Sequence, residues 1–143
     1  MPLTETTLSK AKGELAAAAK KAGAEPQYAI FYSSSVGGQL WCPGCRQVEG
    51  VVKKSFEAAG KPNGTIVYVG NINEWKDKGN KGRTEYALTH VPTILRLEGV
   101  GVAAQATADA QGKETGRLVG GQIANSSHLK TLLTGGEVPR YEP

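Results

Sequence analysis

The stretch Trp41-Cys42-Pro43-Gly44-Cys45 holds both cysteines of this 143-residue chain. An apolar, β-prone run, Gln27 to Ser33, comes shortly before it, and a helical pattern, Val48 to Phe56, follows it. Two cysteines separated by two residues, placed where a strand gives way to a helix, are typical of a thiol that exchanges disulfides. The motif therefore predicts an α/β fold and a redox site.

The spacing predicts a different role for each sulfur. If Cys42 lies at the start of the helix and Cys45 lies one turn in, the sulfurs are close together and the first is the more exposed. The N-terminus of a helix favours the thiolate. Pro43 suits the first helical turn, where its missing N–H costs nothing. We expect Cys42 to be the nucleophile and Cys45 to be the resolving thiol.

Composition narrows the class of protein. The chain is long enough for one domain, residues 1–143, with a core that needs no disulfide. Its formal charge of +4 comes from 17 Lys and Arg against 13 Asp and Glu, which are dispersed, so we expect no nucleic-acid partner. No run of about 18 apolar residues is present and the first 24 residues lack the apolar centre of a secretory signal. We expect a cytoplasmic protein without a membrane partner, in which a close cysteine pair is catalytic or metal-binding.

Hydrophobic periodicity predicts alternating helices and strands. We expect loose ends at residues 1–6 and 135–143, and a long Gly-, Ala- and Gln-rich loop at 99–116. We also expect a short helix at Arg83 to Leu88. The expected helices cover Thr7 to Ala22, Pro43 to Phe56 and Ser126 to Leu133, the last with Asn125 as N-cap, and the expected strands cover Gln27 to Ser33, Thr65 to Gly70, His90 to Leu97 and Arg117 to Val119.

Two other interpretations of the cysteine pair are an inert buried pair and half of a zinc site. Zinc usually takes four ligands, and His90 and His128 are the only histidines, so both would have to converge on the pair. We therefore expect no metal. Trp41 is either a core residue or, beside a nucleophile, part of a half-exposed apolar platform, and we favour the platform.

The motif at 41–45, the helix after it and Val91-Pro92-Thr93 together resemble the thioredoxin superfamily. Within it, the chain is similar to the Clot-type branch, the family of thioredoxin domain-containing protein seventeen. That branch has the motif WCPDC, an insertion before it, here Ser33 to Leu40, and a W-K-D signature after the central strand, here Trp75-Lys76-Asp77. The similarity covers about residues 26–98. It implies a thioredoxin fold, in which helices flank a central mixed β-sheet in a single domain.

The resemblance also implies a geometry for the site. An X-Pro bond is cis in only about 5–6% of cases in folded proteins, so the residues alone favour a trans bond at Pro92. The family instead implies a cis Pro92 that faces the two sulfurs, with the backbone of Val91 offered to the substrate. The residues expected to contact the substrate are Trp41, Pro43, Gly44, Val91 and Pro92.

We therefore expect a thiol–disulfide oxidoreductase of the protein-disulfide reductase type, which reduces small disulfides such as cystine or selected protein disulfides. The resemblance implies that electrons come from NADPH through thioredoxin reductase, without a bound cofactor, and we expect a monomer. One alternative is a peroxidase or denitrosylase that uses the same thiolate. Another is a protein-binding module in which the thiols act as a redox switch.

The chain departs from the family at two places. Gly44 stands where the family usually has Asp, so a negative charge beside Cys42 is absent, which favours the thiolate unless the flexible glycine loosens the start of the helix. Thioredoxins also place a buried Asp in the strand before the motif, whereas residues 27–40 contain no acid. Either Glu49, a water or a distant residue accepts the proton of the resolving thiol, or that step is slow near neutral pH.

Overall fold

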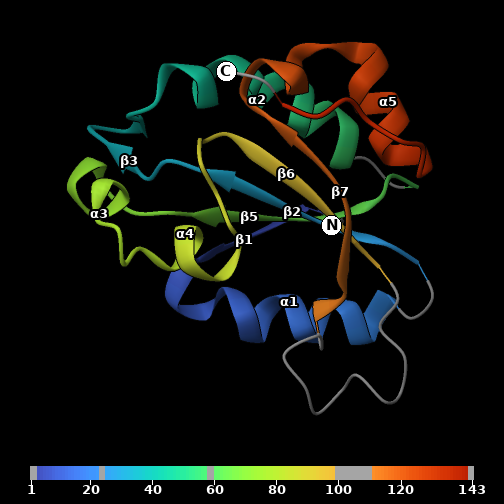
Figure 1. The fold of residues 1–143 in the computed structure, drawn as a ribbon, viewed down its shortest axis with the longest axis horizontal. Helices are drawn as coiled ribbons and strands as arrows, with labels where there is room; N and C mark the ends of the chain where they lie inside the picture. The colour runs from blue at the N-terminus through green and yellow to red at the C-terminus, as the bar shows by residue number, and fades with distance from the viewer. Residues whose placement is uncertain (1–2, 23–24, 58–59, 99–110, 142–143) are drawn as a thin grey trace.

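The computed structural model describes residues 3–22, 25–57, 60–98 and 111–141 (Figure 1). A five-stranded sheet in the order β1-β5-β2-β6-β7 forms its centre. The pairs β1–β5 and β5–β2 are parallel, whereas β2–β6 and β6–β7 are antiparallel. The strands are β1 (Leu3–Thr7), β2 (Gln27–Tyr32), β5 (Asn63–Tyr68), β6 (Thr93–Glu98) and β7 (Lys113–Val119).

Helices cover both faces of this sheet (Figure 1). One face carries α1 and the short α4, and the other carries α2, α5 and a 3-10 turn, η3. The predicted single domain with a mixed sheet flanked by helices is therefore confirmed. The helices are α1 (Leu8–Ala22), α2 (Pro43–Phe56), α3 (Ile72–Lys76), α4 (Lys81–Glu85), η3 (Gly120–Ala124) and α5 (Ser126–Thr134).

The central strand β2 is buried along its whole length. Because successive side chains of a strand point to opposite faces, Tyr28, Ile30 and Tyr32 pack under α2 while Ala29 and Phe31 pack toward α1. A strand that is covered on both faces is expected to be apolar throughout. The sequence of β2 therefore fits its place in the middle of the sheet.

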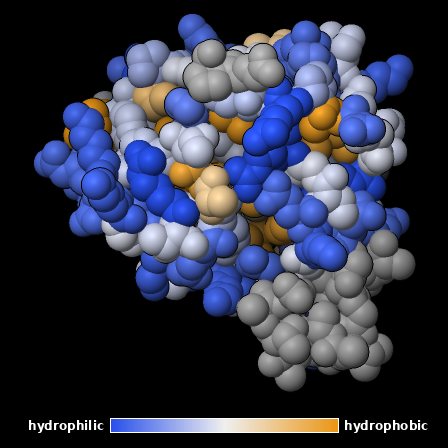
Figure 2. Space-filling model, viewed as in Figure 1, coloured by the Kyte–Doolittle hydropathy of each residue, from blue (hydrophilic) through white to orange (hydrophobic). Residues whose placement is uncertain are grey.

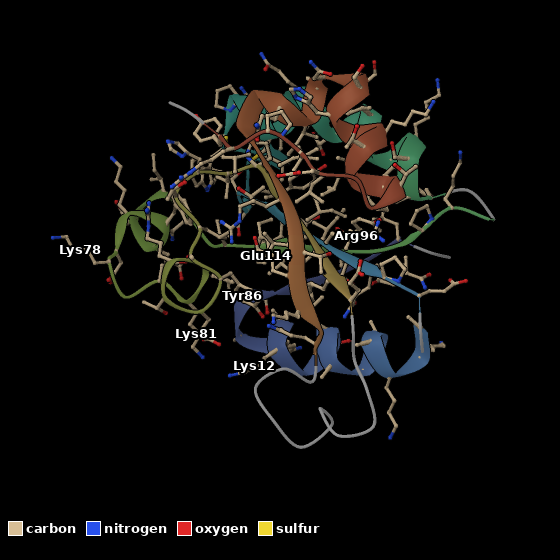
Figure 3. The ribbon with its side chains drawn as sticks, turned by 45° about the vertical axis from the view of Figure 1, so that its right-hand side comes forward. Lys12, Lys78, Lys81, Tyr86, Arg96 and Glu114 are labelled. Carbon is tan, nitrogen blue, oxygen red and sulfur yellow. The ribbon has the colours of Figure 1, made fainter. Side chains whose placement is uncertain are left out.

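Figure 3 shows the two sides of the sheet through labelled side chains. Tyr86 lies on the α1 side, where its ring packs 4.9 Å from that of Phe31 between centroids. Arg96, from β6, lies on the opposite side and donates hydrogen bonds to the Tyr28 hydroxyl at 2.7 Å and to the Leu132 carbonyl of α5 at 3.0 Å. These contacts hold α5 against the sheet.

The edges of the sheet correct two predictions. Residues 1–6 were expected to be loose, but Leu3–Thr7 form β1, which pairs with β5 over five positions. The expected loop at 99–116 ends earlier than predicted because β7 begins at Lys113 and pairs with β6. Residues 99–110 of that loop lie outside the described residues. Both segments are too polar to be predicted as strands without their pairing partners.

The two insertions also contain more regular structure than predicted. The segment before the motif forms a hairpin of β3 (Ser35–Val36) and β4 (Gln39–Leu40), with two glycines at positive φ in its turn. The segment after β5 contains α3, which begins with a capping box between Asn71 and Glu74. The short helix expected at 83–88 lies at Lys81–Glu85.

The C-terminal helix agrees with the sequence. Asn125 caps α5 by accepting a hydrogen bond from the backbone N–H of His128, and Gly135 ends the helix in a left-handed conformation. Of the end expected to be loose, 135–143, residues 136–141 have no regular structure but contact the rest of the chain, and residues 142–143 lie outside the described residues. The Gln122 side chain donates to the Pro139 carbonyl at 3.0 Å, and the Tyr141 ring lies 5.2 Å from that of His90.

The surface shown in Figure 2 is mostly polar, with apolar residues in small separate areas. Across the described residues, Val36 and Ile72 are the large hydrophobic side chains that are exposed. Within those same ranges, no helix combines the length and the apolar composition needed to cross a membrane.

Candidate active site

The cysteine motif lies at the start of α2, as predicted. Cys42 is the N-cap residue, with an extended backbone, and Pro43 occupies the first helical turn. Both cysteines are free thiols; Cys42 is half-buried and Cys45 is completely buried. The helix therefore presents one sulfur at its N-terminus and keeps the other beneath its first turn.

Ser33, which directly follows β2, forms a hydrogen bond with each cysteine. Its hydroxyl accepts a hydrogen bond from the backbone N–H of Cys42 at 3.1 Å. Its own backbone N–H donates to the sulfur of Cys45 at 3.4 Å. Ser33 thus fixes the motif relative to the central strand across the β3–β4 hairpin. Sequence reasoning placed Ser33 at a strand end but gave it no role in the site.

The surroundings of Cys45 keep its proton in place. Burial, the largest cause, and the neighbouring Cys42 raise the pKa of Cys45 to about 12, although the Ser33 N–H acts in the opposite direction. A group this far from its usual range stays a neutral thiol at neutral pH. It can act as a nucleophile only after its proton is removed.

The loop before β6 approaches Cys42 from the other side. The Cys42 thiol donates to the Val91 carbonyl, with 3.5 Å between sulfur and oxygen. The Val91–Pro92 peptide bond is cis. The carbonyl of the buried Pro92 accepts a hydrogen bond from the backbone N–H of Gly120 at 2.8 Å. Three segments far apart in the sequence therefore meet around Cys42.

Trp41 lies between the predicted alternatives, half-buried rather than fully in the core. Its indole N–H donates to the Gly70 carbonyl at 2.9 Å, and its ring packs against the α1-side core, as does the side chain of Val91. The hydroxyl of Ser34 accepts from the Gly70 backbone N–H at 2.9 Å. Gly70 therefore links the segment after β5 to the residue that precedes Cys42, a role that sequence reasoning did not predict.

The remaining predicted site residues lie at the surface of the motif. Pro43 is exposed and Gly44 is half-buried. A Cβ atom added at Gly44 would lie 3.4 Å from the Pro92 Cδ and 3.8 Å from the Cys42 sulfur. These distances are ordinary contacts, so a side chain fits there and would face the nucleophile.

The segment that contains the W-K-D insertion is stabilised by the side chains of Arg83 and Asn80. The guanidinium of Arg83 lies 3.8 Å from the centre of the Trp75 ring and its Nε donates to the Trp75 carbonyl at 2.7 Å. The side chain of Asn80 donates to the carbonyls of Val69 and Glu74, both at 3.0 Å. These contacts hold the segment that follows Gly70.

The two histidines do not converge on the cysteines. His90 is exposed and shares a hydrogen bond with the hydroxyl of Thr89, and His128 lies on α5. In the part of the chain that the structure describes, no three His, Cys, Asp or Glu side chains are grouped so that they could hold a metal ion. The zinc interpretation therefore has no support from this geometry.

Comparisons with known proteins agree with this architecture. Thioredoxin domain-containing protein 17 of Danio rerio is 42% identical over 62 residues, which are 41% of this chain and 49% of that protein. The thioredoxin-like protein Clot of Arabidopsis thaliana is 34% identical over 65 residues, 43% of this chain and 48% of that protein. The chain thus spans about half the length of the curated relatives it matches. A solved poplar thioredoxin h superposes with a TM-score of 0.60 at 16% identity, over 94% of this chain and 95% of that one.

The solved structure shows the fold alone, because its sequence identity is low. The sequence model described as "Thioredoxin domain-containing protein 17-like, thioredoxin domain" matches residues 7–135. The cysteine pair, the Val91–Pro92 loop and the W-K-D insertion all fall inside that range. Because this match covers most of the chain, the chain belongs to the thioredoxin domain-containing protein 17-like family.

Proposed function

We propose that this protein is a disulfide reductase that acts on small disulfides such as cystine or on selected protein disulfides. The observation that carries the proposal is the unequal burial of the pair. Cys42 is accessible at the N-terminus of α2, whereas Cys45 is buried with a raised pKa. A dithiol arranged in this way can attack with one sulfur and release the product with the other.

The reaction has two steps. The Cys42 thiolate attacks one sulfur of the substrate disulfide, a new bond joins Cys42 to that sulfur, and the other half of the substrate leaves as a thiolate that takes up a proton. Cys45 then loses its proton and attacks the Cys42 sulfur. The second half of the substrate leaves as a thiol and the Cys42–Cys45 disulfide closes.

Restoring the dithiol requires two electrons and two protons. We propose that they come from NADPH through thioredoxin reductase, in the reducing environment of the cytoplasm, and that the protein works as a monomer. No bound cofactor is needed for this exchange, because the sulfurs themselves carry the electrons.

The substrate would lie between the motif and the Val91–Pro92 loop. The Val91 carbonyl is directed toward the Cys42 thiol, so a bound substrate segment would lie against Val91 and Pro92. Trp41, Pro43 and Gly44 would form the other side of this groove. The β3–β4 hairpin follows Ser33 directly and precedes Trp41, so it would narrow the approach for large substrates.

The test is NADPH oxidation in the presence of thioredoxin reductase, with cystine and insulin as alternative substrates. We expect turnover with cystine that exceeds turnover with insulin and that is lost in Cys42→Ser. Reduction by Cys42→Ser at the wild-type rate would contradict the proposal. Turnover with hydrogen peroxide or a nitrosothiol instead of cystine would indicate the peroxidase or denitrosylase alternative. A partner captured stoichiometrically by Cys45→Ser, without turnover in the wild type, would indicate the binding module.

A further inference from the structure

A cavity of about 270 Å³ lies between α2 and the parallel edge of the sheet, on the same side as the cysteines. Its floor is formed by the buried side chains of Tyr32, Val52 and Ile66. Its rim is formed by charged side chains, among which Glu5 and Glu49 are exposed. The cavity therefore reaches from solvent to buried side chains between α2 and the sheet.

The floor of the cavity contains an unpartnered polar group. The Tyr32 hydroxyl is buried and has no hydrogen-bond partner among the described residues. A buried hydroxyl without a partner is costly, which favours a water in contact with it. A water molecule takes up about 30 Å³ in the liquid, so a cavity of 270 Å³ has room for several.

Tyr32 lies near the resolving thiol. Both side chains belong to the buried cluster on the α2 side of the sheet, and Cys45 is among the groups whose charge acts on the Tyr32 hydroxyl. Burial, the largest cause, and the negative charges that Glu49, Cys45 and Tyr68 can carry raise the pKa of Tyr32 above its usual range. The hydroxyl thus stays protonated, and a neutral hydroxyl can accept one hydrogen bond while donating another.

Glu49 connects the cavity to solvent. It follows Cys45 by four residues on α2, so the two side chains lie one turn apart on nearby faces of the helix. Its carboxylate lines the rim of the cavity whose floor contains Tyr32. The strand β1 also lines this cavity, through Leu3 and Glu5, and Glu5 accepts a hydrogen bond from the Tyr68 hydroxyl.

We propose that Tyr32 and Glu49 form a proton route from Cys45 to solvent through this cavity. Residues 27–40 contain no Asp or Glu that could accept this proton. It rests on the proposed function, because it serves the second step of that reaction. As the Cys45 sulfur attacks Cys42, its proton passes through the Tyr32 hydroxyl and cavity water to the Glu49 carboxylate and then to solvent.

The test uses 5,5′-dithiobis(2-nitrobenzoate) as the substrate disulfide, because it separates the two steps. Attack by Cys42 releases one equivalent of the coloured thiolate, and attack by Cys45 on the mixed disulfide releases the second. Stopped-flow absorbance therefore gives one phase for each cysteine. Because the leaving thiolate needs no proton, the second phase reports proton removal from Cys45.

We expect Tyr32→Phe and Glu49→Gln to slow the second phase by about 100-fold at pH 7, at the lower end of the range for general acid–base catalysis, and to leave the first within about twofold. The second phase of these variants should rise steadily with pH, as hydroxide replaces the route. Glu49→Asp should recover part of the rate. The control is Glu57→Gln, which removes a carboxylate from the same cavity, twelve residues beyond Cys45 on the chain, and should leave both phases unchanged.

Two results would overturn the proposal, and they are distinguishable. Two phases in the wild type with an unchanged second phase in both variants would exclude the route while leaving the proposed function intact. A wild type that releases a single equivalent would contradict the proposed function and the route together. Thermal unfolding of each variant shows that the comparison is made on folded protein, and Glu49 is exposed, so Glu49→Gln is expected to fold.

Discussion

Cys42 and Cys45 lie three residues apart in sequence but in opposite environments. Cys42 is half-buried, occupies the N-cap position of α2 and faces the Val91 carbonyl. Cys45 is fully buried, accepts a hydrogen bond from the Ser33 N–H and has a strongly raised pKa. This difference distinguishes two chemically identical groups within one short motif. In the proposed reaction, the accessible thiol attacks first, and the buried thiol attacks only after a mixed disulfide has formed.

The largest expected effect comes from removing one sulfur at a time. Cys42→Ser should lower cystine reduction by more than about a thousandfold, because a thiolate nucleophile is lost. Cys45→Ser should still attack the substrate but should accumulate the mixed disulfide on Cys42, detectable by mass spectrometry of the intact protein. Accumulation of an adduct on Cys45 in the Cys42→Ser protein would show that the two cysteines are not functionally distinct.

A second prediction concerns stability at high pH. An unfolded cysteine ionises near pH 8.5, whereas burial in the folded protein raises the pKa of Cys45 to about 12. Between these values the unfolded chain has released the proton and the folded protein has kept it. The stability that this proton contributes is therefore fully present below about pH 8.5 and is lost as the pH rises toward 12, by up to about 1.4 kcal/mol per pH unit.

This prediction can be measured by urea unfolding between pH 8 and pH 10.5 under reducing conditions. The proteins to compare are Cys42→Ser and Cys42→Ser/Cys45→Ala, so that other titrating groups cancel. We expect the free energy of unfolding to fall more steeply with pH when Cys45 is present. If the free energy of unfolding fell equally with pH in both proteins, the surroundings of Cys45 would not stabilise its protonated form.

A third, smaller effect is expected from Ser33, which connects the two environments. Ser33→Ala removes the acceptor for the Cys42 backbone N–H and should lower the free energy of unfolding by about 1 kcal/mol. The matched control is Ser55→Ala on α2, where the hydroxyl donates to the Val51 carbonyl of its own helix, and we expect less than about 0.5 kcal/mol there. Equal losses in the two variants would remove any special role for Ser33.

The smallest predicted effect comes from a charge placed beside Cys42. In Gly44→Asp a carboxylate would face Cys42, because a Cβ at this position lies 3.8 Å from its sulfur. We expect alkylation of Cys42 at pH 7 to slow by up to about tenfold, since a nearby negative charge disfavours the thiolate. Gly50→Asp adds the same charge to α2 at a position where an added Cβ would meet no atom within 4 Å, and it should leave the alkylation rate nearly unchanged. Equal slowing in the two variants would point to the helix rather than to the local charge.

The buried helices and strands were predictable because the pattern of hydrophobic residues in the sequence indicates their type and their bounds. The central strand, the helix after the motif and the capped C-terminal helix lie close to their predicted bounds. The edge strand β1 was not predictable. Its sequence, LTETT, is mostly polar, and its strand conformation depends on pairing with β5, about 60 residues further along the chain.

The same division applies to the site. The motif and the family resemblance were sufficient to bring together Cys42, Cys45 and the Val91–Pro92 loop. They did not reveal Ser33 or the cavity, because these depend on which side chains tertiary packing places beneath the helix. For Ser33 the available signal was its position at the strand end, and for the cavity it was the absence of an acid before the motif.

The hydrogen bond from the Ser33 backbone N–H to the Cys45 sulfur also provides a spectroscopic reporter. Closing the disulfide replaces a thiol acceptor with a disulfide sulfur and changes the electron density that this amide proton experiences. The Ser33 amide resonance should therefore move between the reduced and oxidised forms in a ¹⁵N-resolved NMR spectrum. A single backbone signal from the residue that follows the central strand could then report the redox state of the pair during turnover, without a label on either cysteine.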